Sequence, residues 1–121
     1  MQTILITEDD RLFLAGLADF LTQEGFSVKT AVTARKTVES VAADSPDLVI
    51  LDVHLEGGGN GFELCRLLRR RAPLLPIILM SGMDVPAAAE LASKGPTVFL
   101  SKPFFASQVR ELVERQLGAI T

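Results

Sequence analysis

The chain has only one cysteine, Cys65, among its 121 residues, and this scarcity excludes some kinds of small protein. A single thiol cannot close a disulfide within the chain, and it cannot supply the several thiolates of a cysteine-based zinc site. A reducing cytoplasm is therefore the expected compartment. Cys65 lies in a segment of helical periodicity, where it is expected to be a small core residue.

The sequence also lacks a long apolar run and a surplus of basic residues. No stretch reaches the roughly 18 apolar residues that a membrane-spanning helix needs. The N-terminal segment MQTILITEDD has no basic flank and soon turns acidic, unlike a signal peptide. The formal net charge is −3, with 15 acidic and 12 basic residues, so the overall field does not attract nucleic acid. We expect neither membrane insertion nor direct nucleic-acid binding.

The composition is that of an ordinary globular domain. Hydrophobic residues make up 48% of the chain and charged residues 22%. For a chain of this size, folding hides about two-thirds of the surface of the unfolded chain, which is enough for one core. Residues 1–121 are therefore expected to form a single domain.

Short apolar runs typical of buried strands alternate with segments of helical periodicity along the whole chain. The expected strands are 3–7, 26–31, 48–51, 77–80 and 97–100. The expected helices are 10–24, the segment between Thr33 and Pro46, 62–71, 87–93 and about 106–117, and a glycine-rich loop occupies 57–61. This alternation implies right-handed crossovers and a parallel sheet that helices cover on both faces.

Polar side chains follow four of the expected strands. They are Glu8, Asp9 and Asp10, then Asp52, Ser81 and Lys102. In open parallel sheets, ligands bind beyond the carboxyl ends of the strands, where these residues would meet. Crowded carboxylates repel one another, and a hard cation such as Mg²⁺ relieves the repulsion by taking oxygen ligands. Asp52 is then a candidate nucleophile toward phosphorus, Lys102 a charge partner for phosphate oxygens and Ser81 a hydroxyl donor.

In this order and at these strand ends, the residues resemble the receiver (CheY-like) domain of two-component response regulators, from Thr3 to about Leu117. The matching elements are the acidic pair in ILITEDD, the aspartate in LVILDVHL, the Ser81–Gly82 step and the SKPF segment. The resemblance implies an α/β, flavodoxin-like, doubly wound (βα)5 fold. Its five-stranded parallel sheet would have the strand order 2-1-3-4-5, with strands counted along the chain.

The resemblance also implies a role for each site residue. Asp52 would be the phosphoacceptor, which takes a phosphoryl group from a sensor histidine kinase or a histidine phosphotransfer protein. The cofactor would be Mg²⁺, held by the side chains of Glu8, Asp9 and Asp52 and by the backbone carbonyl of His54. Lys102 would pair with the phosphoryl oxygens. Such a domain is a signalling domain rather than an enzyme, and it catalyses only its own phosphorylation and dephosphorylation.

Ser81 and Phe99 would form the switch that reads phosphorylation. In the family, the residue at Ser81 moves toward the phosphoryl group and the ring at Phe99 turns inward behind it. Many relatives have tyrosine in place of Phe99, so the ring of this chain lacks the usual hydroxyl. The movement would reshape the surface of helix 87–93, strand 97–100 and the last helix, where a partner protein or a second protomer would dock to give a homodimer.

The chain departs from the family pattern near the glycine-rich loop and the last helix. Glu56 stands where the family usually has proline, and the loop that follows is one residue longer. The bond between Lys102 and Pro103 is expected to be cis, as it often is in the family. At least one of the adjacent residues Phe104 and Phe105 is expected to be exposed.

Other interpretations stay open at this point. A receiver-like binding module whose output needs no phosphate is supported only by the altered loop 56–61. A small Mg²⁺-dependent phosphatase is disfavoured, because His54 stands where a second carboxylate could serve as the acid. The basic run 69–71 is expected to be a solvated helix end that suits the helix dipole, with a docking role as the alternative. The chain fits either a stand-alone receiver or a part of a larger regulator or hybrid kinase.

Overall fold

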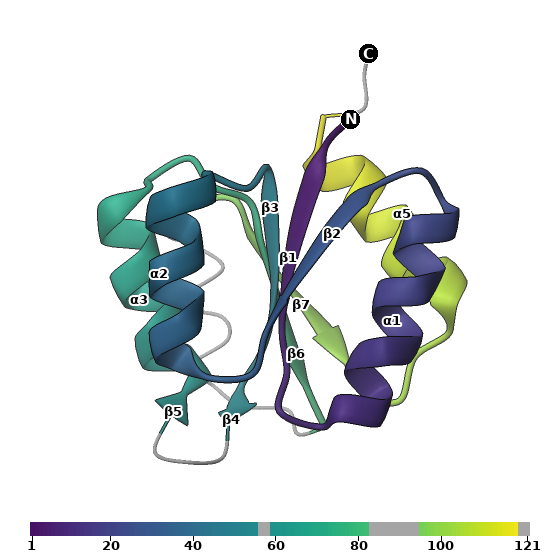
Figure 1. The fold of residues 1–121 in the computed structure, drawn as a ribbon, viewed down its shortest axis with the longest axis horizontal. Helices are drawn as coiled ribbons and strands as arrows, with labels where there is room; N and C mark the ends of the chain where they lie inside the picture. The colour runs from purple at the N-terminus through teal and green to yellow at the C-terminus, as the bar shows by residue number, and fades with distance from the viewer. Residues whose placement is uncertain (56–58, 83–94, 119–121) are drawn as a thin grey trace.

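In the computed structural model, which describes residues 1–55, 59–82 and 95–118, a parallel sheet separates two pairs of helices (Figure 1). The strands of this sheet are β1 (Thr3–Thr7), β2 (Ser27–Ala31), β3 (Leu48–Asp52), β6 (Ile77–Ser81) and β7 (Thr97–Ser101). Their order is β2-β1-β3-β6-β7, and every neighbouring pair is parallel. Because β4 and β5 belong to a separate hairpin, this is the predicted order 2-1-3-4-5, and the predicted doubly wound α/β fold is confirmed.

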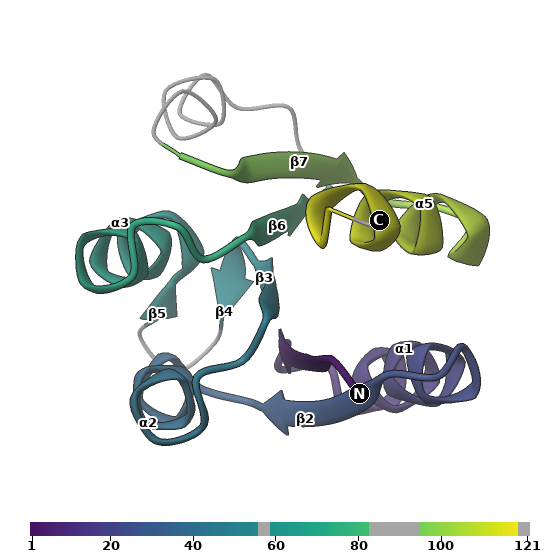
Figure 2. The same cartoon turned by 90° about the horizontal axis from the view of Figure 1, so that it is seen from above.

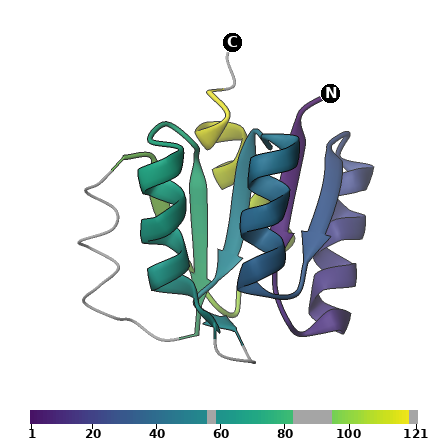
Figure 3. The same ribbon diagram turned by 60° about the vertical axis from the view of Figure 1, so that its left-hand side comes forward.

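The described helices cover both faces of the sheet in pairs. Helices α1 (Arg11–Gln23) and α5 (Ala106–Gln116) lie on one face, and α2 (Ala34–Asp44) and α3 (Gly61–Arg71) lie on the other (Figures 2 and 3). The helix predicted over 87–93 falls outside the described residues. No helix in the described part of the chain is both long enough and apolar enough to span a bilayer.

The strands are apolar throughout because each one is buried on both sides. Successive side chains of a strand point to opposite faces, so Ile4 and Ile50 pack toward α1 and α5, whereas Leu5 and Val49 pack toward α2 and α3. Cys65 is 1% exposed in the second of these clusters, as predicted for a core residue. The two clusters hold the sheet between the helices and fix the direction of the strand ends.

The start of α1 is set by a single carboxylate. Asp10 precedes the helix, and its Oδ1 accepts hydrogen bonds from the backbone N–H groups of Leu12 and Phe13, at 3.2 and 3.1 Å. A side-chain oxygen before the first turn satisfies N–H groups that lack a partner within the helix. The structure thus assigns the capping role to Asp10.

The segment after β3 differs from the expected irregular loop. Strands β4 (His54–Leu55) and β5 (Gly59–Asn60) pair antiparallel as a short ladder. A pair of two-residue strands is held together by backbone hydrogen bonds. Strands this short show no alternation of apolar and polar side chains by which the sequence could predict them. Helix α3 begins at Gly61 instead of residue 62, because Asn60 caps it with Oδ1 2.8 Å from the backbone nitrogen of Phe62.

Gly61 is required by close packing against the end of β3. A Cβ at this position would lie 2.3 Å from the carbonyl oxygen of Asp52 and 2.5 Å from the Cα of Val53. The backbone N–H of Gly61 also donates to the carbonyl of Val53 at 2.8 Å. The start of α3 therefore presses directly on the backbone that carries Asp52.

The expectation of a wholly solvated basic run at the end of α3 is wrong for Arg69. Its guanidinium is half-buried and donates to the carbonyls of Ala72, Pro73, Leu75 and Pro96 and to Oγ1 of Thr97. Burial lowers the pKa of Arg69 from its usual value. The carbonyls that end a helix have no partner within it, and a guanidinium with five N–H groups can reach several of them at once. Arg69 thus ties the end of α3 to the start of β7.

The segment between β7 and α5 agrees with the expectations. The peptide bond between Lys102 and Pro103 is cis. Of the two adjacent phenylalanines, Phe105 is 78% exposed, whereas Phe104 packs edge-to-face on Phe13 with the ring centroids 5.8 Å apart.

Candidate functional site

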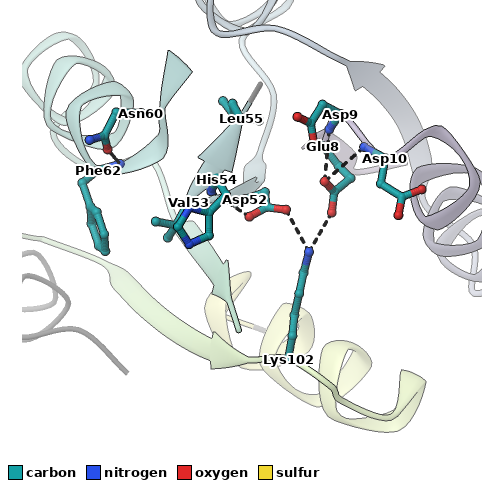
Figure 4. Close-up of a pocket in the computed structure, with 10 residues that line it drawn as sticks. All are labelled: Glu8, Asp9, Asp10, Asp52, Val53, His54, Leu55, Asn60, Phe62 and Lys102. Atoms are coloured by element: carbon teal, nitrogen blue, oxygen red, sulfur yellow. Dashed lines mark hydrogen bonds and ion pairs between the residues drawn. The ribbon is translucent and has the colours of Figure 1, made fainter. Parts of the chain in front are cut away.

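A cavity of about 500 Å³ opens at the carboxyl ends of the central strands (Figure 4). Its lining residues are Glu8, Asp9, Asp10, Asp52, Val53, His54, Leu55, Asn60, Phe62 and Lys102. The lining comes from the segments after β1, β3 and β7 and from the start of α3. The structure therefore gathers Glu8, Asp9, Asp52, His54 and Lys102 at one place, as the sequence predicts.

Asp52 is the last residue of β3 and is only 4% exposed. Its Oδ1 accepts a hydrogen bond from the backbone N–H of His54 at 2.9 Å, and its Oδ2 accepts one from Nζ of Lys102 at 2.8 Å. The apolar strand behind it is covered on both faces, so the side chain is directed to the edge of the sheet. One carboxylate oxygen is thus held by the backbone two residues ahead and the other by a lysine from the end of β7.

Glu8 lies beside Asp52 and is 1% exposed. Its Oε2 accepts from the backbone N–H groups of Asp9 and Asp10, at 3.1 and 3.3 Å, and its Oε1 accepts from Lys102 at 2.9 Å. Burial and the neighbouring Asp52 carboxylate raise the pKa of Glu8 to about 7, against the opposing effect of Lys102. A buried carboxyl group beside a second negative charge ionises less readily.

Lys102 closes this group from the end of β7. Its backbone N–H donates to the carbonyl of Ser81 at 2.7 Å, which ties it to the end of β6. Its ammonium bridges Glu8 and Asp52 and also lies 4.5 Å from the centre of the Phe13 ring. Burial alone would lower the pKa of Lys102, but its hydrogen bonds to Asp52 and Glu8 outweigh burial and raise it. The lysine is therefore a fixed positive charge between two carboxylates.

The acidic side chains are close enough together to bind one cation. Glu8, Asp9 and Asp52 each offer an oxygen, and these oxygens all lie within 4.8 Å of one another. Mg²⁺ takes oxygen ligands and is commonly held by one or two carboxylates together with waters and phosphate oxygens. The residues present thus fit Mg²⁺, and the open cavity beside them has room for further ligands.

The two predicted switch residues lie outside this cavity. Ser81 ends β6 and is 1% exposed, but it is not one of the described residues that line the cavity. Phe99 lies in the middle of β7 and packs, half-buried, against the cluster on the α2 and α3 side of the sheet. Ser81 and Phe99 stand on neighbouring strands, since Ser81 is aligned with Ser101 two residues after Phe99.

Some residues of the site were not predicted from the sequence. Asn60 and Phe62 line the cavity, and Phe13 contacts Lys102 from α1. Asn60 had a detectable signal, because an asparagine three residues before Glu63 is typical of a helix start. Phe13 had none, because its place in the apolar stripe of α1 predicts only a core contact.

Comparison with known proteins places this geometry in a family. The family model described as "Response regulator receiver domain" matches residues 4–114. The nitrogen assimilation regulatory protein NtrX of Azorhizobium caulinodans is 33% identical over 119 residues, which cover 97% of this chain and 26% of the relative. The regulatory protein SphR of Synechococcus elongatus is 36% identical over 122 residues, 93% of this chain and 46% of the relative. The chain thus spans less than half the length of these two curated relatives.

Solved structures are similar over nearly the whole chain. The receiver domain of NtrX from Brucella abortus has a TM-score of 0.88 and 28% identity, with 97% of this chain and 99% of that chain covered. A two-component response regulator from Clostridium difficile has a TM-score of 0.89 and covers 98% of both chains, but at 23% identity it supports the fold alone. Together with the matching family model, these similarities establish that the chain belongs to the receiver-domain family of two-component response regulators.

Proposed function

We propose that this receiver domain accepts a phosphoryl group on Asp52 from a phosphohistidine of a sensor histidine kinase or histidine phosphotransfer protein. The observation that carries the proposal is the setting of Asp52. Its carboxylate is held by Lys102 and by the backbone of His54 at the floor of an open cavity. A positioned carboxylate nucleophile with a cation beside it is the arrangement that phosphoryl transfer needs.

The transfer would exchange one bond to phosphorus for another. A carboxylate oxygen of Asp52 forms the new P–O bond while the bond between phosphorus and the donor imidazole nitrogen breaks. The donor imidazole leaves with the electron pair of that bond. When its other ring nitrogen carries a proton, the released imidazole is neutral. Lys102 would then hold a phosphoryl oxygen, because its ammonium already lies 2.8 Å from Oδ2 of Asp52.

Mg²⁺ is the cofactor that the acidic group fits best. Glu8, Asp9 and Asp52 would bind it through their side chains, and His54 through its backbone carbonyl. When bound, Mg²⁺ supplies positive charge that offsets the negative charge of the carboxylates and the incoming phosphoryl group. The pKa of Glu8 is raised first by burial and then by the neighbouring Asp52 carboxylate, and a bound cation would offset both effects by favouring the ionised form.

The phosphoryl group would be read through Ser81 and Phe99. The carbonyl of Ser81 accepts a hydrogen bond from the backbone N–H of Lys102, so a movement of Lys102 is transmitted directly to the end of β6. Phe99 lies two residues before Ser101 on the adjoining strand and would turn inward behind it. The altered surface would include 87–93, β7 and α5, and a second protomer docking there would give a homodimer.

We also propose a cytoplasmic signalling role for residues 1–121 as one receiver domain, in keeping with the single cysteine of the chain. The net charge of −3 gives no general attraction to nucleic acid, so DNA binding is not proposed for this chain. The domain would catalyse only the formation and hydrolysis of its own phosphoaspartate.

The proposal is tested by incubation with a small phosphodonor, such as acetyl phosphate, and Mg²⁺, followed by intact-mass spectrometry. The wild type should gain the mass of one phosphoryl group, and Asp52→Ala should gain none. Asp9→Asn is a useful companion, because it keeps the acceptor but weakens the metal site and should slow the reaction. An adduct that is undiminished in Asp52→Ala would overturn the assignment of the acceptor.

A further inference from the structure

We propose that Phe13 is a positioning residue for the phosphoryl-transfer site, because its aromatic face holds the ammonium of Lys102 against Asp52. This inference rests on the function proposed above and assigns a role to a side chain outside the acidic cavity. Phe13 belongs to α1, and nothing in its place on the helix sets it apart from the other apolar residues that face the sheet.

The contact is geometrically well defined. The Nζ atom of Lys102 lies 4.5 Å from the centroid of the Phe13 ring. The same Nζ donates to Asp52 at 2.8 Å and to Glu8 at 2.9 Å. Within the described part of the chain, the ammonium thus contacts two carboxylates and one ring face. A cation within about 6 Å of a ring centroid is attracted by the negative face of the ring.

Phe13 is itself held from two directions. Its backbone N–H donates to Oδ1 of Asp10 at 3.1 Å, so the cap of α1 fixes its main chain. Its ring meets Phe104 edge-to-face, at an interplanar angle of 84°. Aromatic pairs favour this arrangement, in which the ring edge of one meets the face of the other. A ring fixed in this way can position a flexible lysine, whereas a mobile ring would simply follow it.

The chemistry explains why a ring suits this place better than another polar group. A third carboxylate would add negative charge next to Asp52 and compete with phosphoryl oxygens for the ammonium. The ring carries no net charge and accepts no strong hydrogen bond, so it attracts the ammonium without taking one of its directed donors. When Lys102 exchanges a carboxylate oxygen for a phosphoryl oxygen, the contact with Phe13 can persist.

The test compares Phe13→Leu with Phe13→Tyr, because leucine removes the ring and tyrosine keeps it. The matched control is Phe20→Leu, which removes another phenyl group from α1 that also packs on the α1 and α5 side of the sheet. The first readout is the proton shift of the Lys102 ε-methylene group, measured by NMR without Mg²⁺ or phosphodonor. Ring currents should displace this signal in the wild type, in Phe13→Tyr and in Phe20→Leu, but not in Phe13→Leu.

The second readout is the rate of phosphorylation by acetyl phosphate with Mg²⁺. We expect Phe13→Leu to be slower than wild type by about three- to tenfold, the range of a partly desolvated cation–π contact, with Phe13→Tyr and Phe20→Leu close to wild type. An unchanged rate in a folded Phe13→Leu protein would overturn the inference, as would equal slowing by Phe20→Leu. If the wild type forms no adduct, the proposed function fails, and the NMR comparison still decides whether Phe13 positions Lys102.

Discussion

Glu8 and Asp52 extend from the neighbouring strands β1 and β3 and share one ammonium, that of Lys102, at 2.9 and 2.8 Å. Both carboxyl groups are almost fully buried, whereas the lysine side chain is 26% exposed. The lysine thus partly neutralises two acids that would otherwise repel each other. The balance between these three groups determines how the stability of the domain responds to pH and to substitution.

Stability should fall as the pH rises through the range in which Glu8 ionises. The pKa of Glu8 is raised from 4.5 to about 7 in the folded state, so the folded protein binds this proton more tightly than the unfolded chain does. The stabilising contribution is complete below about pH 4.5 and is lost as the pH approaches and passes 7. Glu8→Gln should remove this dependence and be more stable than wild type above pH 7, by on the order of 1 to 3 kcal/mol.

The measurement is urea unfolding at several pH values without divalent cations. Asp44→Asn is a suitable control, because Asp44 forms only a partly exposed ion pair with Lys29, far from the cavity. It should keep the slope of the wild type between pH 5 and 7. The account would be contradicted if the stability of the wild type rose with pH in this range and this rise disappeared in Glu8→Gln.

Removal of the lysine charge should destabilise the domain most at high pH. Lys102→Met keeps much of the side-chain volume but leaves Glu8 and Asp52 without their shared cation. We expect a loss of about 1 to 3 kcal/mol at pH 8, moderated by the partial exposure of the lysine, and a smaller loss at pH 5, where Glu8 is protonated. Urea unfolding of the variant and the wild type at both pH values measures the difference. Equal losses at the two pH values would show that the carboxylates are not coupled through Lys102.

Gly61→Ala should be strongly destabilising because a Cβ there would collide with the backbone of Asp52 and Val53. Backbone atoms cannot move away without cost, so we expect the free energy of unfolding to fall by about 1 to 3 kcal/mol. Phosphorylation should also be slower, because the end of β3 must shift. Gly16→Ala is the matched control. Gly16 is exposed within α1 and has nothing within 4 Å of a Cβ, so alanine should stabilise the domain by about 0.5 to 1 kcal/mol. Similar free energies of unfolding for the two variants would contradict the proposed close contact.

Arg69→Met should cost far more stability than the same change at the next residue. Arg69 donates to carbonyls after α3 and to Thr97, and its loss leaves half-buried acceptors without a partner from this side chain. We expect a loss of about 2 to 4 kcal/mol. Arg70 is exposed, and Arg70→Met should change stability by no more than about 0.5 kcal/mol. Thermal or urea unfolding of both variants makes the comparison, and equal effects would argue against a structural role for Arg69.

The sheet and the acidic site were predictable because their signals are local. Leu48 to Leu51 is an uninterrupted apolar run, which is typical of a strand buried on both faces, and Asp52 directly follows it. Once the alternation of strands and helices is recognised, topology brings Glu8, Asp52 and Lys102 to one edge. The chain order of these residues therefore carries most of the information about where they meet.

The remaining features depend on tertiary contacts that leave little trace in the sequence. The pairing of β4 with β5 involves backbone groups and a glycine, so no alternation of side chains marks it. In sequence, Arg69 resembles its exposed neighbours. Its structural role depends on the positions of Pro96 and Thr97, to which its guanidinium donates hydrogen bonds. Phe13 reads as a core residue, because its contact with Lys102 joins segments that lie far apart in the chain.

The most direct test of the central claim is to identify the residue that carries the phosphoryl group. Borohydride reduces an acyl phosphate but not a phosphoramidate, so treatment of the phosphorylated protein should convert the acceptor aspartate to homoserine. Peptide mapping by tandem mass spectrometry then locates the converted residue and separates Asp52 from its neighbour His54. The account predicts homoserine at position 52 after incubation with acetyl phosphate and Mg²⁺. Conversion at Asp9 or elsewhere, or phosphate retained on His54 without any conversion, would contradict it.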